Sequence, residues 1–401
     1  MIFQPKMDAA LCAQFINKTV SFRYHGVELR FDLSQSLFSS FDVDAGSKLL
    51  LKSIAQQVDM EEIRTVLDFG CGSGVLGIAL GKRYPQCAVD FLDRNALALA
   101  VTERNLKQNH VTWRRLMHAA GLLGMPDERY DLLVSNVPAK AGNAVIRHFI
   151  RDFPAFVSRE GVIAIVIVDT LADLAAAAIR DAGGTVMFQE AGKEHTVFHY
   201  RASASAAPEK DLSPYQRLSP SISHKKVSWK LGTVYGLPEF DSLSYATTLL
   251  LDLVASEHCG HRVLVWNPGQ GHVPLFLFKK RSGKWIEFVL AGRDRLALEI
   301  SRENLLAAGL PAERVRLDPR PSFHEVAGRF QTVIIFPDRD PGVPWREVLV
   351  KKAFSLLAPE GRAVLAAKST FVHTLFEHTT NAVIIQDKRT AGFRAVLFRP
   401  G

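Results

Sequence analysis

The two halves of the chain carry the same series of sequence blocks, and this internal repeat constrains the fold more than any other feature. Five blocks of the first half occur again in the second half, in the same order and with similar spacing. The clearest pair is TVLDFGCGSGVLGIAL from Thr65 and RVLVWNPGQGHVPLFL from Arg262. The other pairs begin at Phe38 and Pro238, Asp93 and Gly292, Tyr130 and Phe330, and Val157 and Leu357. Chance similarity would explain one or two blocks, so the pattern predicts a tandem duplication.

A stretch rich in Ala, Ser and Pro, from Ala202 to Lys226, separates the two halves. It has no sustained apolar period, which is typical of an interdomain linker. With 401 residues, of which 47% are hydrophobic, the chain is long enough for two domains that each bury a core. We therefore expect a first domain over residues 1–205, a linker over 206–226 and a second domain over 227–401. A long surface loop inside one domain is the alternative.

Strands and helices alternate in each half. In the first half, short apolar runs predict strands at 66–69, 88–93, 131–136 and 161–168, and the segments 75–83 and 96–109 have helical character. This order predicts the α/β class, with two tandem Rossmann-like domains whose doubly wound sheets are mostly parallel. Ligands of such sheets bind beyond the carboxyl ends of the strands. The segment 70–74, Asp93 and Asn136 would stand at three of these ends.

Cysteine usage and hydropathy exclude several classes of protein. The four cysteines lie far apart without a C-x-x-C pair, so neither a disulfide scaffold nor a metal site is expected. The N-terminus lacks the features of a signal peptide, and the longest apolar run, Gly161 to Val168, is too short to span a bilayer. We expect a soluble protein of the cytoplasm that has no membrane partner. The oligomeric state stays open.

The basic charge is confined to one half of the chain. Residues 1–205 carry 22 Lys and Arg against 22 Asp and Glu, whereas residues 206–401 carry 27 against 19, which accounts for the whole net charge of +8. This excess favours a polyanionic partner whose phosphates the second half would contact. Ordinary solvated lysines and arginines are the alternative. The two halves are therefore expected to differ in role.

A glycine-rich turn follows the first buried strand of the first half, in the order Asp68-Phe69-Gly70-Cys71-Gly72-Ser73-Gly74. Glycines there let the backbone adopt positive φ and approach a ligand closely. The carboxylate of Asp68 would repel a pyrophosphate but suits an ammonium group, and Asp93 ends the next strand where a ribose diol would lie. These features favour S-adenosyl-L-methionine (SAM) over a dinucleotide as cofactor.

These residues resemble motif I and the following acidic position of class I SAM-dependent methyltransferases. The segment Ser135 to Gly142 (SNVPAKAG) is similar to the Asn-Pro-Pro loop of methyltransferases that act on exocyclic amines. It is most similar to the form found in the "small domain" subfamily, which includes RsmC-like ribosomal RNA guanine-N2 methyltransferases. The resemblance implies that the loop from Gly70 to Gly74, including Cys71 and Gly72, contacts the methionine and ribose of SAM. It also implies that Asp93 accepts hydrogen bonds from the ribose hydroxyls.

The amine loop has a clear chemical logic. An aryl amine is a poor nucleophile because its lone pair is delocalised into the ring, and two acceptors that hold its hydrogens direct the lone pair toward the methyl group. Asn136 Oδ1 and the carbonyl of Val137 are the candidates, and Pro138 restricts Val137 to extended conformations. Lys140 matches an arginine of the subfamily and is expected to reach a phosphate.

Two segments differ from the subfamily pattern, and a third allows two interpretations. Val137 replaces the first proline of the amine loop, and Ala139 stands where many members place an aromatic residue. The segment His118 to Gly121 lacks the acid that contacts the adenine amine in many members. The segment Leu37 to Leu51 is similar to one that closes over the cofactor, which makes Gly46 a further cofactor-binding candidate. Read locally, Asp44 or Ser47 would simply cap a helix over 48–56.

The second half has lost the residues of this site. Val265 stands opposite Asp68, Asn267 opposite Gly70, Gly292 opposite Asp93 and Phe336 opposite Asn136. RsmC-like proteins also pair an active with a degenerate copy, although there the degenerate copy comes first. The second half is thus expected to keep the fold without the site.

The hypothesis that unites these features is a SAM-dependent methyltransferase with a catalytic first domain and a second domain that recognises RNA. The resemblance implies methyl transfer to an exocyclic amine, with guanine-N2 of ribosomal RNA as the acceptor. One alternative keeps the cofactor and changes the acceptor to a small molecule or a protein. Another is a non-catalytic scaffold that binds SAM or RNA.

Overall fold

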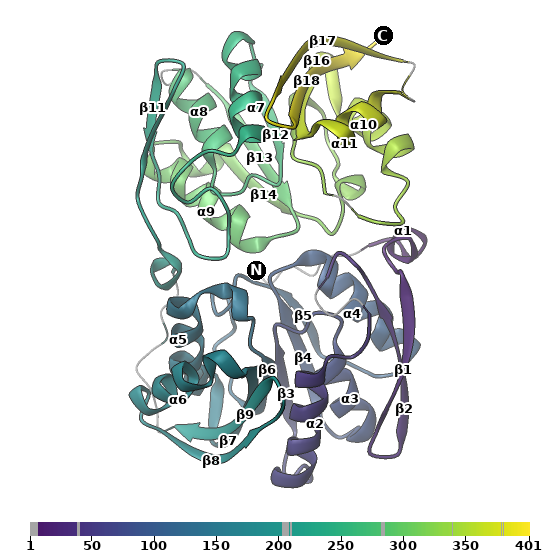
Figure 1. Ribbon diagram of the computed structural model, residues 1–401, viewed down its shortest axis with the longest axis vertical. Coiled ribbons are helices and arrows are strands. Elements are labelled where there is room, and N and C mark those ends of the chain that lie inside the picture. The colour runs from purple at the N-terminus through teal and green to yellow at the C-terminus, as the bar shows by residue number, and fades with distance from the viewer. Residues whose placement is uncertain are drawn as a thin grey trace. The chain divides into compact units, whose positions relative to one another are not determined.

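The computed structural model of the protein describes residues 7–37, 41–202, 208, 211–281, 285–338, 340–377, 379 and 381–401. The chain divides into two compact units, Met1–Tyr215 and Gln216–Gly401, each built around one seven-stranded sheet (Figure 1). The division falls inside the segment expected to be a linker. That segment is not wholly irregular, because the short helix η4 (Ser213–Tyr215) ends the first unit and strand β10 (Ser221–His224) lies near the start of the second.

The first unit begins with helix α1 (Ala9–Gln14) and a hairpin of β1 (Lys18–Tyr24) and β2 (Val27–Leu33). Its sheet has the order β5-β4-β3-β6-β7-β9-β8, in which β3 to β7 run parallel and β9 is antiparallel to both neighbours. The strands are β3 (Thr65–Phe69), β4 (Ala88–Asp93), β5 (Arg115–His118), β6 (Tyr130–Asn136), β7 (Val157–Val168), β8 (Gly184–Ala191) and β9 (His195–Ala202). The predicted mostly parallel sheet is therefore confirmed.

Helices cover both faces of this sheet. Helices α2, α3 and α4 lie on one side of it in Figure 1, and α5 and α6 lie on the other. Their bounds are α2 (Ala45–Gln57), α3 (Val75–Arg83), α4 (Ala96–Gln108), α5 (Asn143–Asp152) and α6 (Ala172–Asp181). The short 3-10 helices are η1 (Ala139–Ala141), η2 (Phe153–Phe156) and η3 (Asp169–Leu171). Helix α2 begins three residues before the expected start because Asp44 caps it, accepting a hydrogen bond from the amide of Ser47.

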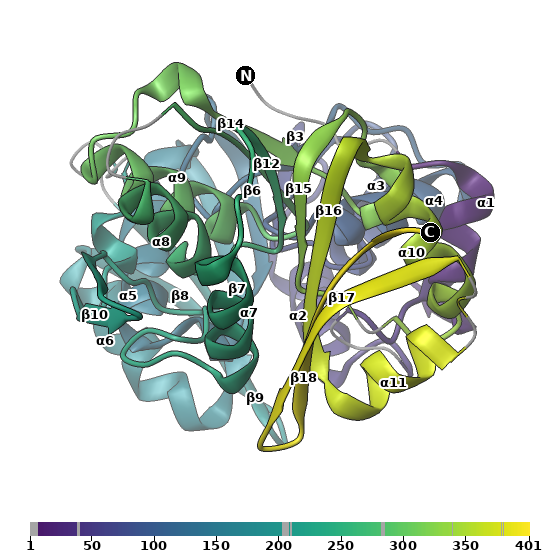
Figure 2. The ribbon, with the colours of Figure 1, turned by 90° about the horizontal axis from the view of Figure 1, so that it is seen from above.

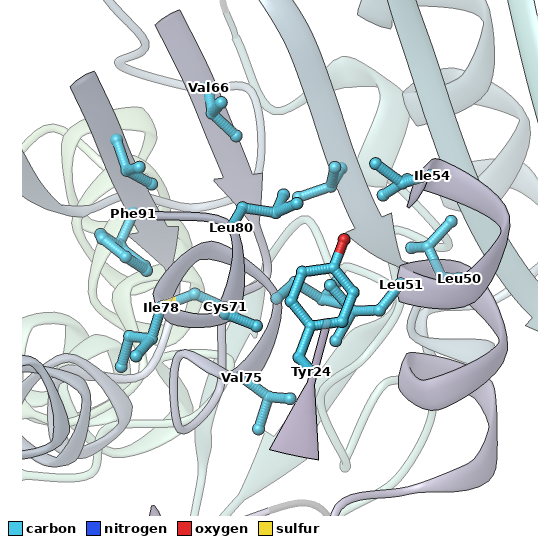
Figure 3. Close-up of a cluster of buried hydrophobic side chains, with 14 of the residues drawn as sticks. Tyr24, Leu50, Leu51, Ile54, Val66, Cys71, Val75, Ile78, Leu80 and Phe91 are labelled. Atoms are coloured by element: carbon cyan, nitrogen blue, oxygen red, sulfur yellow. The ribbon is translucent and has the colours of Figure 1, made fainter. Parts of the chain in front are cut away.

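A hydrophobic cluster fixes the glycine-rich turn to the rest of the first unit. Figure 3 shows Tyr24 from the hairpin, Leu50 from α2 and Ile78 from α3 in this cluster, together with Cys71 from the turn. All four side chains are buried. Packing of this kind leaves the turn between β3 and α3 little freedom to move, which positions its backbone.

The second unit repeats this architecture. After the hairpin of β10 and β11 (Val227–Lys230) comes a sheet of order β14-β13-β12-β15-β16-β18-β17, which matches the first unit strand for strand. Figure 2 shows α7 and α8 on one side of it and α10 and α11 on the other. The elements are α7 (Tyr245–Ser256), β12 (Arg262–Trp266), α8 (His272–Lys280), β13 (Glu287–Gly292), α9 (Arg295–Ala307), η5 (Ala312–Arg314), β14 (Val315–Pro319), η6 (Phe323–Glu325), β15 (Phe330–Ile335), α10 (Trp345–Ser355), β16 (Leu357–Lys368), α11 (Ser369–Glu377), β17 (Ala382–Thr390) and β18 (Phe393–Pro400).

Equivalent side chains hold the glycine-rich turn in both units. Thr102 Oγ1 donates to the carbonyl of Gly72 at 2.9 Å, and Ser301 Oγ donates to that of Gly269 at 3.0 Å. Three residues further along each helix, an asparagine amide donates to the next carbonyl of the turn, at 2.9 Å in both units. Shared topology together with shared side-chain bonds supports the tandem duplication that the sequence predicts.

No helix within the described ranges is long and apolar enough to cross a membrane. The same residues contain no cluster of three or more His, Cys, Asp or Glu side chains suited to hold a metal ion.

Candidate functional site

The glycine-rich turn of the first unit is a rigid backbone structure. Gly70, Gly72 and Gly74 have φ values of +72°, +57° and +82°, which favour glycine because other side chains are strained there. The amides of Gly70 and Cys71 both donate to the carbonyl of Leu92, at 2.8 and 3.0 Å. The turn is therefore bonded to the strand that ends at Asp93, which brings two of the predicted cofactor contacts together.

The glycines of this region have two different roles. A Cβ added to Gly70 or Gly72 would meet no other atom within 4 Å, so the backbone there faces open space. A Cβ on Gly74 would lie 2.8 Å from Thr102, and one on Gly77 would overlap the ring of Phe91. The first two glycines thus leave room for a ligand, whereas the last two allow close packing.

Asp93 is joined directly to the turn. Its Oδ2 accepts a hydrogen bond from the amide of Gly72 at 2.9 Å, and its Oδ1 accepts one from the amide of Asn95 at 2.8 Å. The side chain is half-buried at the end of β4. A carboxylate accepts hydrogen bonds, so the chemistry of Asp93 suits the hydroxyls of a diol.

Asp68 is a buried carboxyl group with one unsatisfied oxygen. Its Oδ2 accepts a hydrogen bond from the amide of Gly77 at 2.8 Å, but its Oδ1 has no partner among the described residues. The pKa of Asp68 is raised to about 7, chiefly by burial and also by the negative charge of Asp93, while the hydrogen bond from the Gly77 amide acts in the opposite direction. An unsatisfied buried carboxylate oxygen fits the ammonium group of a ligand.

The Cys71 thiol belongs to the core and faces away from the open side of the turn. It is buried, lies 3.6 Å from Thr102 Oγ1, and has a pKa that burial raises well above the ordinary value of a thiol. Only the backbone of Cys71 is thus suited to touch a cofactor.

Asn136 ends β6 and is held by the first turn of α2. Its Nδ2 donates to Asp44 Oδ1 at 3.0 Å and to Ser47 Oγ at 3.2 Å. An ionised carboxylate only accepts hydrogen bonds, so the neighbour of Asp44 must be the nitrogen of the amide. The two bonds direct Asn136 Oδ1 away from α2 and leave it as the acceptor of the site. From the sequence we expected Asp44 or Ser47 to cap a helix, and we did not predict this contact.

The rest of the amine loop is anchored by Val137. Its amide donates to the carbonyl of Val166 at 2.9 Å, and its side chain is only 3% exposed. A proline at this position would lack the N–H, so the replacement exchanges a rigid ring for a hydrogen bond and an apolar anchor. Pro138 is exposed with φ −69°, and Lys140 is exposed within η1. Lys140 is therefore accessible to a substrate.

Gly46 lies beneath the contact between Asp44 and Asn136. A Cβ at this position would come within 2.9 Å of His195 Cδ2 and 3.0 Å of Asp44 Oδ1. Packing of the first turn of α2 against β9 thus requires glycine here, and the cofactor role of Gly46 stays a prediction. Phe38, Ser39 and Ser40, which the sequence places in the same segment, lie outside the described residues.

Tyr215 covers the segment that lacks the adenine-contacting acid. Its hydroxyl donates to the carbonyl of Ala120 at 3.0 Å, and its side chain is 3% exposed. Gly121 has φ +60°, and a Cβ there would overlap the Tyr215 hydroxyl. No feature of the sequence links positions 120 and 215, so this contact was not predicted.

The equivalent region of the second unit is filled by its own side chains. Asp338 accepts hydrogen bonds from Trp266 Nε1 and Asn267 Nδ2, each at 3.0 Å. Arg293 donates to both oxygens of Asp340, at 2.8 and 2.7 Å. Asp338 and Asp340 thus bind side chains at the ends of the neighbouring strands β12 and β13. The predicted loss of the site from the second unit now has a structural basis.

A sheet of this order, with a glycine-rich turn after β3 and an acid at the end of β4, defines the fold of class I methyltransferases. The sequence model of the family described as "Methyltransferase small domain" matches residues 28–199. These residues are therefore similar in sequence to a methyltransferase small domain, in line with the resemblance of their motifs.

Two relatives share about a third of their length with this chain. The "Ribosomal RNA small subunit methyltransferase C" of Psychromonas ingrahamii is 33% identical over 125 residues, which are 31% of this chain and 34% of the relative. The protein of the same name from Vibrio vulnificus is 34% identical over 122 residues, which are 30% and 34%.

A solved structure shares the fold of both units. It is that of a T. thermophilus 16S rRNA N2 methyltransferase (RsmC) in complex with AdoMet and guanosine. It has a TM-score of 0.64 and 17% sequence identity, and the similarity covers 96% of this chain and 99% of that one. At this identity the similarity establishes a common two-unit fold.

Proposed function

We propose that this protein is a SAM-dependent methyltransferase that methylates an exocyclic amine, guanine-N2, in ribosomal RNA. The observation that carries the proposal is the pair of hydrogen bonds from Asn136 Nδ2 to Asp44 and Ser47. They orient the Asn136 amide so that its oxygen is available to an amine at the carboxyl edge of the sheet. Strands β3 and β6 are neighbours, so this oxygen lies near the glycine-rich turn that follows β3.

The residues of the turn fit the cofactor. The open space beside Gly70 and Gly72 receives it, Asp93 accepts hydrogen bonds from its ribose hydroxyls, and the unsatisfied oxygen of Asp68 offers a counter-charge for its ammonium group. When bound, the cofactor supplies an electrophilic methyl group. The buried wall of the turn limits the access of water to this place.

The amine loop prepares the nucleophile. Asn136 Oδ1 and the carbonyl of Val137 accept the two amine hydrogens, which turns the lone pair of nitrogen out of conjugation with the ring. The amide of Val137 is bonded to β7, and Pro138 restricts Val137 to extended conformations, which limits the directions open to its carbonyl. Lys140 contacts a phosphate of the substrate. No strong base is needed, because the amine loses its proton readily once it is alkylated.

The relatives support the choice of acceptor. Two are named as methyltransferases of ribosomal RNA, and the solved structure of the same fold contains guanosine. In this chain, the second unit with its excess of basic residues would bind the RNA. A ribosomal substrate would place the protein in the cytoplasm.

Transfer of labelled methyl groups from SAM tests this proposal. Total RNA, ribosomal subunits and a protein extract from a strain without the gene are each incubated with the purified protein. The proposal predicts label in RNA alone. Label in protein or in small molecules, with none in RNA, would contradict it and favour the other acceptor classes.

A further inference from the structure

The second unit contains a shallow cavity of about 310 Å³, open to solvent, at the carboxyl ends of β15 and β16. This volume is near the lower end of the range of about 300–1,000 Å³ for small-ligand sites. Side chains of the loop after β15 and of the first turns of α10 and α11 line it, among them Asp340, Trp345, Arg346, Thr370, Phe371 and Thr374. The cavity is therefore of a size and place to hold one small group.

Two aromatic side chains form a wall of this cavity. The rings of Trp345 and Phe371 are stacked, with centroids 4.0 Å apart and planes at 22°. Phe371 is only 6% exposed, whereas Trp345 is partly exposed toward solvent. Phe371 thus backs the indole and fixes its orientation, which is the arrangement of a stacking platform.

The charge of the cavity suits an anionic ligand. Both oxygens of Asp340 accept hydrogen bonds from Arg293, so the guanidinium offsets the negative charge of Asp340. Arg346 is exposed, and its guanidinium carbon lies 5.3 Å from the centroid of the Trp345 ring. An aromatic face beside an arginine is the pair of groups that binds an unstacked nucleotide, with the base on the ring and the phosphate on the guanidinium.

The repeat gives this cavity a counterpart in the first unit. The segment from Phe330 aligns with that from Tyr130, so the loop after β15 corresponds to the amine loop after β6. In the second unit, Asn267 occupies the place that corresponds to the cofactor position beside the amine loop. A Cβ on Gly292, which stands opposite Asp93, would lie only 2.9 Å from Asn267 Oδ1. A base held here would not meet a methyl donor.

We propose that this cavity binds one unpaired nucleotide of the RNA substrate, with its base stacked on Trp345 and its phosphate on Arg346. The inference rests on the RNA substrate of the proposed function. The second unit would thereby use the place of a former acceptor site for recognition instead of reaction.

Binding of a fluorescein-labelled single-stranded hexaribonucleotide, alternating guanosine and adenosine, to the full chain without SAM tests this site. Trp345→Leu is expected to weaken binding about 5- to 100-fold, which is the usual loss when one stacked base loses its aromatic partner. Trp345→Phe should keep most of the affinity. Arg346→Gln should lower the salt dependence of binding by about one phosphate contact.

Trp285→Leu is the matched control. Trp285 is 48% exposed in the same unit and has Arg314 5.6 Å from its ring, but it does not line the cavity. Unchanged affinity in Trp345→Leu, or an equal loss in Trp285→Leu, would overturn the proposal. If Trp345→Leu does not fold, as judged by thermal unfolding, Trp345→Phe and Arg346→Gln decide the question.

The test separates this inference from the proposed function. If the wild type methylates RNA but Trp345→Leu binds the hexanucleotide as tightly as the wild type, the proposed function stands and the nucleotide site is refuted. If Trp345→Leu loses binding of the hexanucleotide but the wild type methylates no RNA, the nucleotide site stands and the proposed function is refuted.

Discussion

Asn136 Nδ2 donates a hydrogen bond to Asp44 Oδ1 at 3.0 Å, and this bond joins the end of β6 to the first turn of α2 across 92 positions of the sequence. The bond places the amide nitrogen of Asn136 against Asp44, which leaves the amide oxygen of Asn136 as the acceptor of the site. Asp44 at the same time caps α2 through the amide of Ser47. One carboxylate therefore stabilises the helix and orients the side chain that would hold the amine.

Replacement of Asn136 by alanine is expected to lower kcat for RNA methylation by about 100- to 1,000-fold, as does removal of one polar group that stabilises a transition state in other enzymes. The affinity for SAM should change little, because no cofactor-binding candidate hydrogen-bonds to the Asn136 side chain within the described part of the chain. Single-turnover rates and calorimetric SAM binding measure the two effects. Asn143→Ala, at an exposed position of α5, is the control and should keep wild-type rates.

Asp44 acts through Asn136, so its variants should separate capping from orientation. Asp44→Ala removes both the cap and the acceptor for Asn136 Nδ2, and we expect a loss of about 1 kcal/mol in the free energy of unfolding together with a lower kcat. Asp44→Asn retains an acceptor oxygen and a good cap, and should retain most of both. Equal kcat values in Asp44→Ala and the wild type would show that Asn136 is oriented without Asp44. The double variant with Asn136→Ala should be no slower than Asn136→Ala alone.

Local pattern predicted the fold of the first unit closely. The helix 75–83 and the strands that end at Asp93 and Asn136 occur as expected, because apolar periodicity and the glycine-rich turn both reflect short-range chemistry. The contacts of Asp44 and Tyr215 were beyond reach, since each partner is about 90 residues away and carries no sequence signal.

Asp68→Asn should stabilise the free protein and weaken SAM binding. The pKa of Asp68 is raised to about 7 in the folded protein, so the folded state holds a proton that the unfolded state releases near pH 4. The contribution of Asp68 to the free energy of unfolding therefore falls as pH rises from about 4 to 7 and is level above that. Asparagine does not ionise, so the variant should exceed the wild type by about 1–4 kcal/mol at pH 8 in urea unfolding.

The same group should couple SAM binding to pH. A cationic ligand favours ionised Asp68 and lowers its pKa, so binding to the wild type should be tighter at pH 8 than at pH 6, with release of a proton. Calorimetry in buffers of different ionisation enthalpy detects that proton. An affinity that is independent of pH between 6 and 8 in the wild type would contradict this role of Asp68.

Two glycines of the turn should respond differently to alanine. Gly72→Ala places a methyl group in the open space beside the turn at φ +57°, so we expect a large loss of SAM affinity and a stability loss of only about 1–2 kcal/mol. Gly77→Ala overlaps Phe91 in the core, so it should lower the free energy of unfolding by about 1–3 kcal/mol. Thermal unfolding and SAM titration of both variants distinguish these outcomes, and similar SAM affinities would refute the assignment.

The second unit should bind no SAM. Calorimetric titration is expected to give one SAM per chain, because Arg293, Asp338 and their partners fill the equivalent place. Arg293→Ala should not create a second site. It would instead remove the buried guanidinium that binds both oxygens of Asp340 and lower the free energy of unfolding by about 3–5 kcal/mol. Two SAM molecules per wild-type chain would contradict this view of the second unit.

The central claim is methyl transfer to guanine-N2 of ribosomal RNA at Asn136, and the nucleoside product tests it most directly. Ribosomal RNA from a strain without the gene is treated with SAM and either the wild type or Asn136→Ala, digested to nucleosides and analysed by mass spectrometry. The account predicts N2-methylguanosine with the wild type and at most a trace with the variant. Another methylated nucleoside, or equal N2-methylguanosine from both proteins, would contradict it.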